Sequence, residues 1–143
     1  HPRFFVVLFF FLILHTPPAR RGGGGGGGGG GRGGPRPPPR ARVFFVDYLT
    51  VLPPAGVPAA PLSDTDADLG RHVAATLERL TADAATATGC EVVGAAAASR
   101  EHHAWSPEPW TTRPGVPLPG RAAPLHPNAA GMRAVAELVS ARW

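Results

Sequence analysis

The chain has 143 residues and a formal net charge of +4, and its basic charge is unevenly distributed. Seven arginines precede the first acidic residue, Asp47, whereas the rest of the chain carries seven arginines against ten acidic residues, a net charge of −3. The folded part is therefore mildly acidic, which argues against a nucleic-acid partner there. A single cysteine, Cys90, excludes an internal disulfide and a zinc site built from cysteines.

The first 42 residues form a segment of their own. An unbroken apolar run over residues 4–14 follows Arg3 and precedes two prolines, a layout typical of the apolar core of a signal peptide. The run is shorter than the about 20 residues of a bilayer-spanning helix, so no stable membrane span is expected. Ten consecutive glycines at residues 22–31 and the proline- and arginine-rich stretch after them predict a disordered tail. A wrong start or a shifted reading frame explains the segment equally well.

From residue 43 the sequence has the pattern of an α/β domain. Val-Phe-Phe-Val at residues 43–46 predicts a strand buried on both faces, and Asp47 follows at the end where open α/β sheets place ligands. Ser63 with the acidic residues after it predicts a helix start, and Gly89 predicts the helix end. Spacings of four, four and three predict the apolar face of this helix: Leu69, Val73, Leu77 and Leu80.

The second half of the domain is predicted to hold one more strand, a long loop and a last helix. A strand over residues 91–94 would complete a strand–helix–strand unit with a right-handed crossover. The proline-rich segment over residues 99–124 predicts a long loop, and Asn128 predicts a helix cap. The inward face of that helix is predicted to consist of Met132, Val135, Leu138 and Val139.

His126 lies in a proline-rich loop directly before this last helix. Pro127 restricts the backbone beside it, and a ring that faces a cleft there can take a proton from a hydroxyl nucleophile. A zinc site of His102, His103 and His126 is not predicted, because adjacent histidines point in different directions and no carboxylate spacing supports the site. No metal is therefore expected.

Three blocks of the sequence resemble the SGNH/GDSL hydrolases. His-Pro-Asn-Ala-Ala-Gly at residues 126–131, with an amphipathic helix behind it, resembles the last conserved block of that family. The strand at residues 41–48 and the proline-rich loop after it resemble a preceding block. The segment His-His-Ala-Trp-Ser-Pro-Glu-Pro-Trp at residues 102–110 is similar to a loop of the secreted actinobacterial branch. The resemblance covers residues 41–143.

The resemblance implies both a fold and an activity. The implied fold is a three-layer, flavodoxin-like α/β sandwich, of which residues 43–143 would be the C-terminal part, behind a disordered tail over residues 1–42. The implied activity is hydrolysis of carboxylic esters through a serine acyl-enzyme, with His126 as the general base and no cofactor. A small ester or lipid substrate, a monomeric state and a secreted or cell-surface location are expected.

The sequence departs from the family pattern in two places. No Gly-Asp-Ser nucleophile block occurs, so we expect a fragment that lacks the nucleophile. Ala123 stands where the family carries an acid, and its backbone carbonyl is the expected acceptor for the His126 ring, with Asp47 as the alternative acid. Trp105 and Trp110 either line a substrate pocket or pack the long loop.

Two alternatives to an ester hydrolase remain open. A non-catalytic secreted remnant of the same fold would explain the missing nucleophile. A basic, disordered adaptor that contacts nucleic acid or an acidic membrane through residues 1–42 would explain the clustered arginines, and salt-sensitive binding by that segment would support it.

Overall fold

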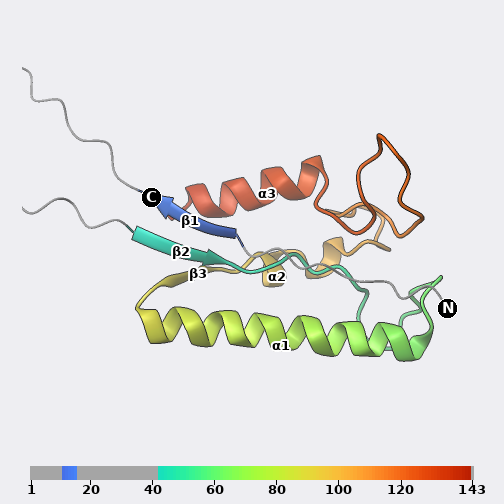
Figure 1. The fold of residues 1–143 in the computed structure, drawn as a ribbon, viewed down its shortest axis with the longest axis horizontal. Coiled ribbons are helices and arrows are strands. Elements are labelled where there is room, and N and C mark those ends of the chain that lie inside the picture. The colour runs from blue at the N-terminus through green and yellow to red at the C-terminus, as the bar shows by residue number, and fades with distance from the viewer. Residues whose placement is uncertain (1–10, 16–41, 143) are drawn as a thin grey trace, which may run out of the picture.

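The computed structural model describes residues 11–15 and 42–142 (Figure 1). The glycine tract and residues 1–10 of the signal-like segment lie outside this part of the chain, and so does most of the segment proposed as a basic adaptor. The elements in chain order are β1 Phe11–His15, β2 Arg42–Val46, α1 Asp64–Thr88, β3 Glu91–Val93, the short helix α2 Ala95–Ala98, the 3-10 helix η1 Arg100–His102 and α3 Ala129–Ser140.

Strand β2 is the centre of a three-stranded sheet. It runs parallel to β3, with Phe44 opposite Glu91, and antiparallel to β1, with Phe11 opposite Val46. The parallel pair, with α1 between its strands in the sequence, confirms the predicted strand–helix–strand order. Strand β1 was not predicted, because the apolar run that contains it was interpreted as the core of a signal peptide. A short apolar run suits a buried strand equally well, so composition does not separate the two.

Local hydrogen bonds set the helix boundaries, and these boundaries agree with the predictions. Ser63 Oγ accepts a hydrogen bond from the Asp66 N–H at 3.1 Å at the start of α1. Gly89 ends α1 with a φ of 67°, a left-handed conformation that costs glycine little. Asn128 Oδ1 caps α3 by accepting from the Gly131 N–H at 2.9 Å.

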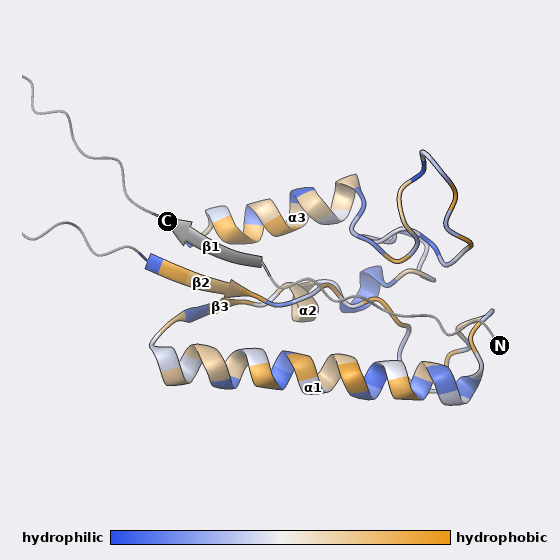
Figure 2. Ribbon diagram, viewed as in Figure 1, coloured by the Kyte–Doolittle hydropathy of each residue, from blue (hydrophilic) through white to orange (hydrophobic). Residues whose placement is uncertain are grey.

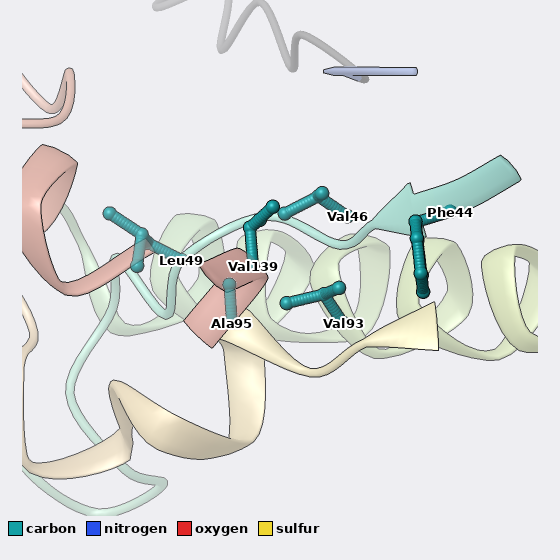
Figure 3. Packing of buried hydrophobic residues seen from close by; sticks show 6 residues of the cluster. All are labelled: Phe44, Val46, Leu49, Val93, Ala95 and Val139. Carbon is teal, nitrogen blue, oxygen red and sulfur yellow. The ribbon is translucent and has the colours of Figure 1, made fainter. Parts of the chain in front are cut away.

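The core lies where β2, β3 and α3 meet (Figure 3). The buried cluster consists of Phe44, Val46, Leu49, Val93, Ala95 and Val139, and Val135 and Leu138 pack against it. The predicted inward face of α3 is therefore confirmed except at Met132, which is 65% exposed. Gly131 takes the inward position in that turn, and the next residue along a helix points about 100° away.

Helix α1 carries several apolar residues along its length (Figure 2), but the residues that it buries are small. Its buried residues are Ala67, Thr81 and Ala85. The predicted apolar face of α1 is only partly covered, because Leu69 and Leu80 are 61% and 51% exposed and Leu77 is half-buried. Periodicity finds an apolar face, but the side that packs is decided by how closely the helix approaches the strands. We call Leu69, Val73 and Leu80 the α1 stripe.

The elements place the protein in the mixed α/β class. Helices α1 and α3 lie on opposite sides of the strands in Figure 1. The flavodoxin-like sandwich stays a prediction, because β2 and β3 are the one parallel pair within the described residues. In this part of the chain, none of the helices is both long and apolar enough to cross a bilayer.

Polar replacement of the α1 stripe tests whether it is a free apolar surface. We expect the combined variant Leu69→Gln, Val73→Thr and Leu80→Gln to bind less anilinonaphthalene sulfonate, measured by dye fluorescence. The free energy of unfolding should change by no more than about 0.5 kcal/mol per site, as is usual for surface substitutions. A control with Val116→Thr and Leu118→Gln, in the exposed loop, should keep the dye fluorescence. Equal dye fluorescence of the wild type and the stripe variant would show that the α1 stripe is not a free apolar surface.

Candidate functional site

The C-terminal end of β2 holds a buried carboxylate. Asp47 Oδ1 accepts a hydrogen bond from the Ala96 N–H at 2.8 Å, at the start of α2. Burial raises the pKa of Asp47 above its ordinary value, and this hydrogen bond opposes the rise. The carboxylate therefore holds α2 against β2, and the alternative in which Asp47 orients the His126 ring finds no support in its contacts.

His126 lies on a loop that pairs with a second extended segment. Thr111 and Pro127 form an antiparallel bridge between the two segments. Next to it, the Thr112 N–H donates to His126 O at 2.7 Å, and the Leu125 N–H donates to Thr112 O at 3.2 Å. The backbone of His126 is thus fixed by a strand-like partner and not by the loop alone.

Leu125, directly before His126, has a φ of 62°. A leucine in this left-handed region costs about 1–2 kcal/mol, because its Cβ crowds the backbone. Such a conformation persists only where neighbouring contacts hold it, and it occurs most often at functional sites. The turn at Leu125 reverses the chain so that His126 can reach back toward residue 124.

The His126 ring bonds to its own loop. Nδ1 lies 3.0 Å from Pro124 O, and the imidazole is half-buried. Since a carbonyl oxygen only accepts, Nδ1 is the donor in this bond, and in the neutral imidazole Nε2 is then the acceptor. The predicted acceptor, Ala123 O, is wrong by one residue, because Ala123 O accepts from Thr112 Oγ1 at 2.6 Å.

Asn128, which caps α3, is bonded to backbone carbonyls of the preceding segment. Asn128 Nδ2 donates to Pro109 O at 2.6 Å, and the Asn128 N–H donates to Trp110 O at 2.9 Å. At Gly131 the helix approaches so closely that a Cβ would collide with Trp110 O. Sequence reasoning predicted the cap but missed this close approach, for which the glycine three residues after Asn128 was the signal.

A cavity of about 1110 Å³ opens beside the C-terminal end of β2. Its walls include residues 47–54, the α1 side chains Leu69, Val73 and Leu77, and the loop residues Pro124 and Leu125. His126 is not one of the lining residues, and its loop contributes to the wall through Pro124 and Leu125. The cavity is lined mainly by aliphatic side chains and prolines.

The two tryptophans pack the long loop. Trp105 Nε1 donates to Ala60 O at 2.9 Å, and the Trp110 ring stacks on the His102 ring with 4.3 Å between centroids. Neither tryptophan lines the cavity. Of the two predicted roles, the contacts support packing, and the substrate-pocket role of Trp105 and Trp110 is not supported. The long loop needs this packing because it contains little regular structure.

No metal centre forms among the histidines that the structure describes. His102 Nδ1 lies 2.8 Å from Glu108 O, and His103 Nδ1 accepts from the Trp105 N–H at 3.3 Å. Within residues 42–142, no group of three or more histidine, cysteine or acidic side chains is placed to hold an ion.

No serine hydroxyl bonds to the His126 ring within the described residues. The Ser99 hydroxyl donates to Ala95 O, and the Ser63 hydroxyl donates to Asp66 at the start of α1. Ser106 Oγ is buried and has no hydrogen-bond partner within the described residues.

Comparison of the chain with family models, curated proteins and solved structures gives no match. The functional interpretation therefore depends on the chain's own residues. They provide a βαβ unit with a parallel strand pair, an apolar cavity at the C-terminal end of its strands, and a histidine on the loop that walls this cavity.

The raised pKa of Asp47 has a measurable effect on stability. Between the ordinary value of 3.8 and the raised pKa, the folded protein keeps a proton that the unfolded chain has released. The free energy of unfolding should therefore fall as the pH rises through this window. Asp47→Asn keeps an acceptor for the Ala96 N–H but cannot ionise, so its stability relative to the wild type should be greater at pH 7 than at pH 4 in urea unfolding. If the stability difference between Asp47→Asn and the wild type is the same at both pH values, the pKa of Asp47 is not raised by burial.

Gly131→Ala tests the close approach of α3 to Trp110. The added Cβ would collide with a backbone oxygen, and overpacking of this kind costs about 1–3 kcal/mol in the free energy of unfolding. Gly115→Ala is the control, because no atom lies within 4 Å of the Cβ position there, and a change within about 0.5 kcal/mol is expected. Equal urea-unfolding midpoints for both variants would show that α3 does not need this contact.

Proposed function

We propose that residues 42–142 form the base-bearing part of an SGNH-type carboxylic ester hydrolase site, with His126 as the general base. The nucleophilic serine would come from a Gly-Asp-Ser block, which these 143 residues do not contain. The proposed fold is the flavodoxin-like sandwich of that family. The motif order of the sequence and the parallel pair β2–β3 support this proposal.

The observation that carries the proposal is the hydrogen bond between His126 Nδ1 and Pro124 O, 3.0 Å long. It selects the tautomer in which Nε2 is the acceptor, as a base needs if it is to take a proton from a hydroxyl group. In the acyl-enzyme mechanism the same nitrogen then returns the proton to the leaving alcohol. In this bond the partner of the ring is a neutral carbonyl and not a carboxylate.

The cavity supports an apolar ester as the substrate class. Aliphatic side chains and prolines form much of its wall, and the loop of His126 closes one side. An acyl chain could lie along α1 while its ester group faces the histidine. The reaction needs no cofactor. Secretion or a cell-surface location, and action as a monomer, belong to the same proposal and rest on the family resemblance.

A second candidate is a non-catalytic remnant of the same fold. The observation in its favour is that no serine hydroxyl engages the His126 ring within the described residues, so the site has a base without a nucleophile. The full chain alone should therefore show no acyl-enzyme burst with a nitrophenyl ester, under either candidate.

A chimera separates the two candidates. Residues 42–142 would replace the C-terminal part of an active SGNH-type hydrolase, and kcat/KM for a short-chain nitrophenyl ester would be measured. We expect activity in the chimera and at least an about 100-fold loss in His126→Ala, the usual contribution of a general base. His72→Ala, at an exposed position on α1, is the matched control and should leave kcat/KM unchanged. A folded chimera without activity, or full activity of His126→Ala, would favour the remnant.

A further inference from the structure

Thr112 holds the loop of His126 by four hydrogen bonds. Two are backbone bonds, from the Thr112 N–H to His126 O at 2.7 Å and from the Leu125 N–H to Thr112 O at 3.2 Å. Two use the hydroxyl, which donates to Ala123 O at 2.6 Å and accepts from the His126 N–H at 3.1 Å. One residue thus satisfies polar backbone groups at three of the four positions from 123 to 126.

The remaining position is Pro124, and its carbonyl is the group that the His126 ring uses. Proline has no N–H, so the carbonyl is its one polar backbone group, and it bonds to Nδ1 at 3.0 Å. The hydroxyl of Thr112 binds on both sides of this carbonyl, at residue 123 and at residue 126. The Thr112 hydroxyl therefore holds the backbone on both sides of the carbonyl that the ring uses.

We propose that Thr112 is the positioning residue for His126, and that its hydroxyl sets the ring tautomer by fixing Pro124 O in place. This inference rests on the proposed function, in which the tautomer matters for proton transfer. The left-handed turn at Leu125 requires neighbouring hydrogen bonds, because a strained turn relaxes unless such bonds hold it. The hydroxyl is required because it donates and accepts at the same time.

The neighbouring residue provides a matched control within the same segment. Thr111 is fully buried, and its hydroxyl has no hydrogen-bond partner within the described residues. Thr111→Val and Thr112→Val make the same chemical change one position apart, and only the second removes bonds to the loop of His126. Thr112→Ser keeps the hydroxyl and removes only the methyl group.

The test uses the full chain and two readouts by nuclear magnetic resonance. The first is the exchange rate of the His126 amide, which donates to the Thr112 hydroxyl. The second is the pair of imidazole nitrogen shifts of neutral His126, which distinguishes the Nδ1–H from the Nε2–H tautomer. Far-UV circular dichroism checks that each variant is folded, and Thr112→Ala replaces Thr112→Val if the valine variant is not.

In Thr112→Val we expect about tenfold faster exchange of the His126 amide, the effect of losing one hydrogen bond of ordinary strength. We also expect a smaller fraction of the Nδ1–H tautomer, since Pro124 O is no longer fixed. Thr112→Ser should restore both values, and Thr111→Val should leave both at the wild-type level. Unchanged exchange and tautomer in folded Thr112→Val, or an equal effect of Thr111→Val, would overturn the proposal. Neither readout depends on hydrolysis, so failure here is distinct from failure of the chimera.

Discussion

The candidate site depends on the pairing of two extended segments, one before and one after residues 113–122. The bridge between Thr111 and Pro127 brings residues 109–112 alongside residues 123–128. On one side of the bridge, Thr112 bonds to the loop of His126. On the other side, Trp110 O accepts a hydrogen bond from the N–H of Asn128, the residue that caps α3. The histidine, the strained turn and the helix start are thus positioned together, by one short piece of antiparallel structure.

The helix boundaries were predicted from the sequence because they depend on local chemistry, whereas the packed face of α1 was not predicted. Ser63, Gly89 and Asn128 mark helix boundaries because each satisfies backbone groups within a few residues. The orientation of α1 is a different kind of property. Its periodicity is clear, yet the helix turns small residues toward the sheet, because burial depends on the strands that it meets.

The candidate site shows the same division. That a backbone carbonyl accepts from the His126 ring was expected from the family resemblance, because Ala123 stands where that family carries an acid. The predicted acceptor was one residue too early in the chain. Leu125 adopts a left-handed conformation. A glycine or asparagine at this position would have indicated such a turn, but a leucine does not. The role of Thr112 was equally hidden, because its partners lie 11 and 14 positions away in the sequence.

The small residues on the packed face of α1 have a consequence for how this helix tolerates change over evolution. Ala67 and Ala85 are almost completely enclosed, so a larger side chain at either position must displace the residues packed around it. Leu80, by contrast, is 51% exposed and does not line the cavity, so it can vary in size and polarity. Along α1 the small enclosed residues are therefore more constrained than this large apolar one.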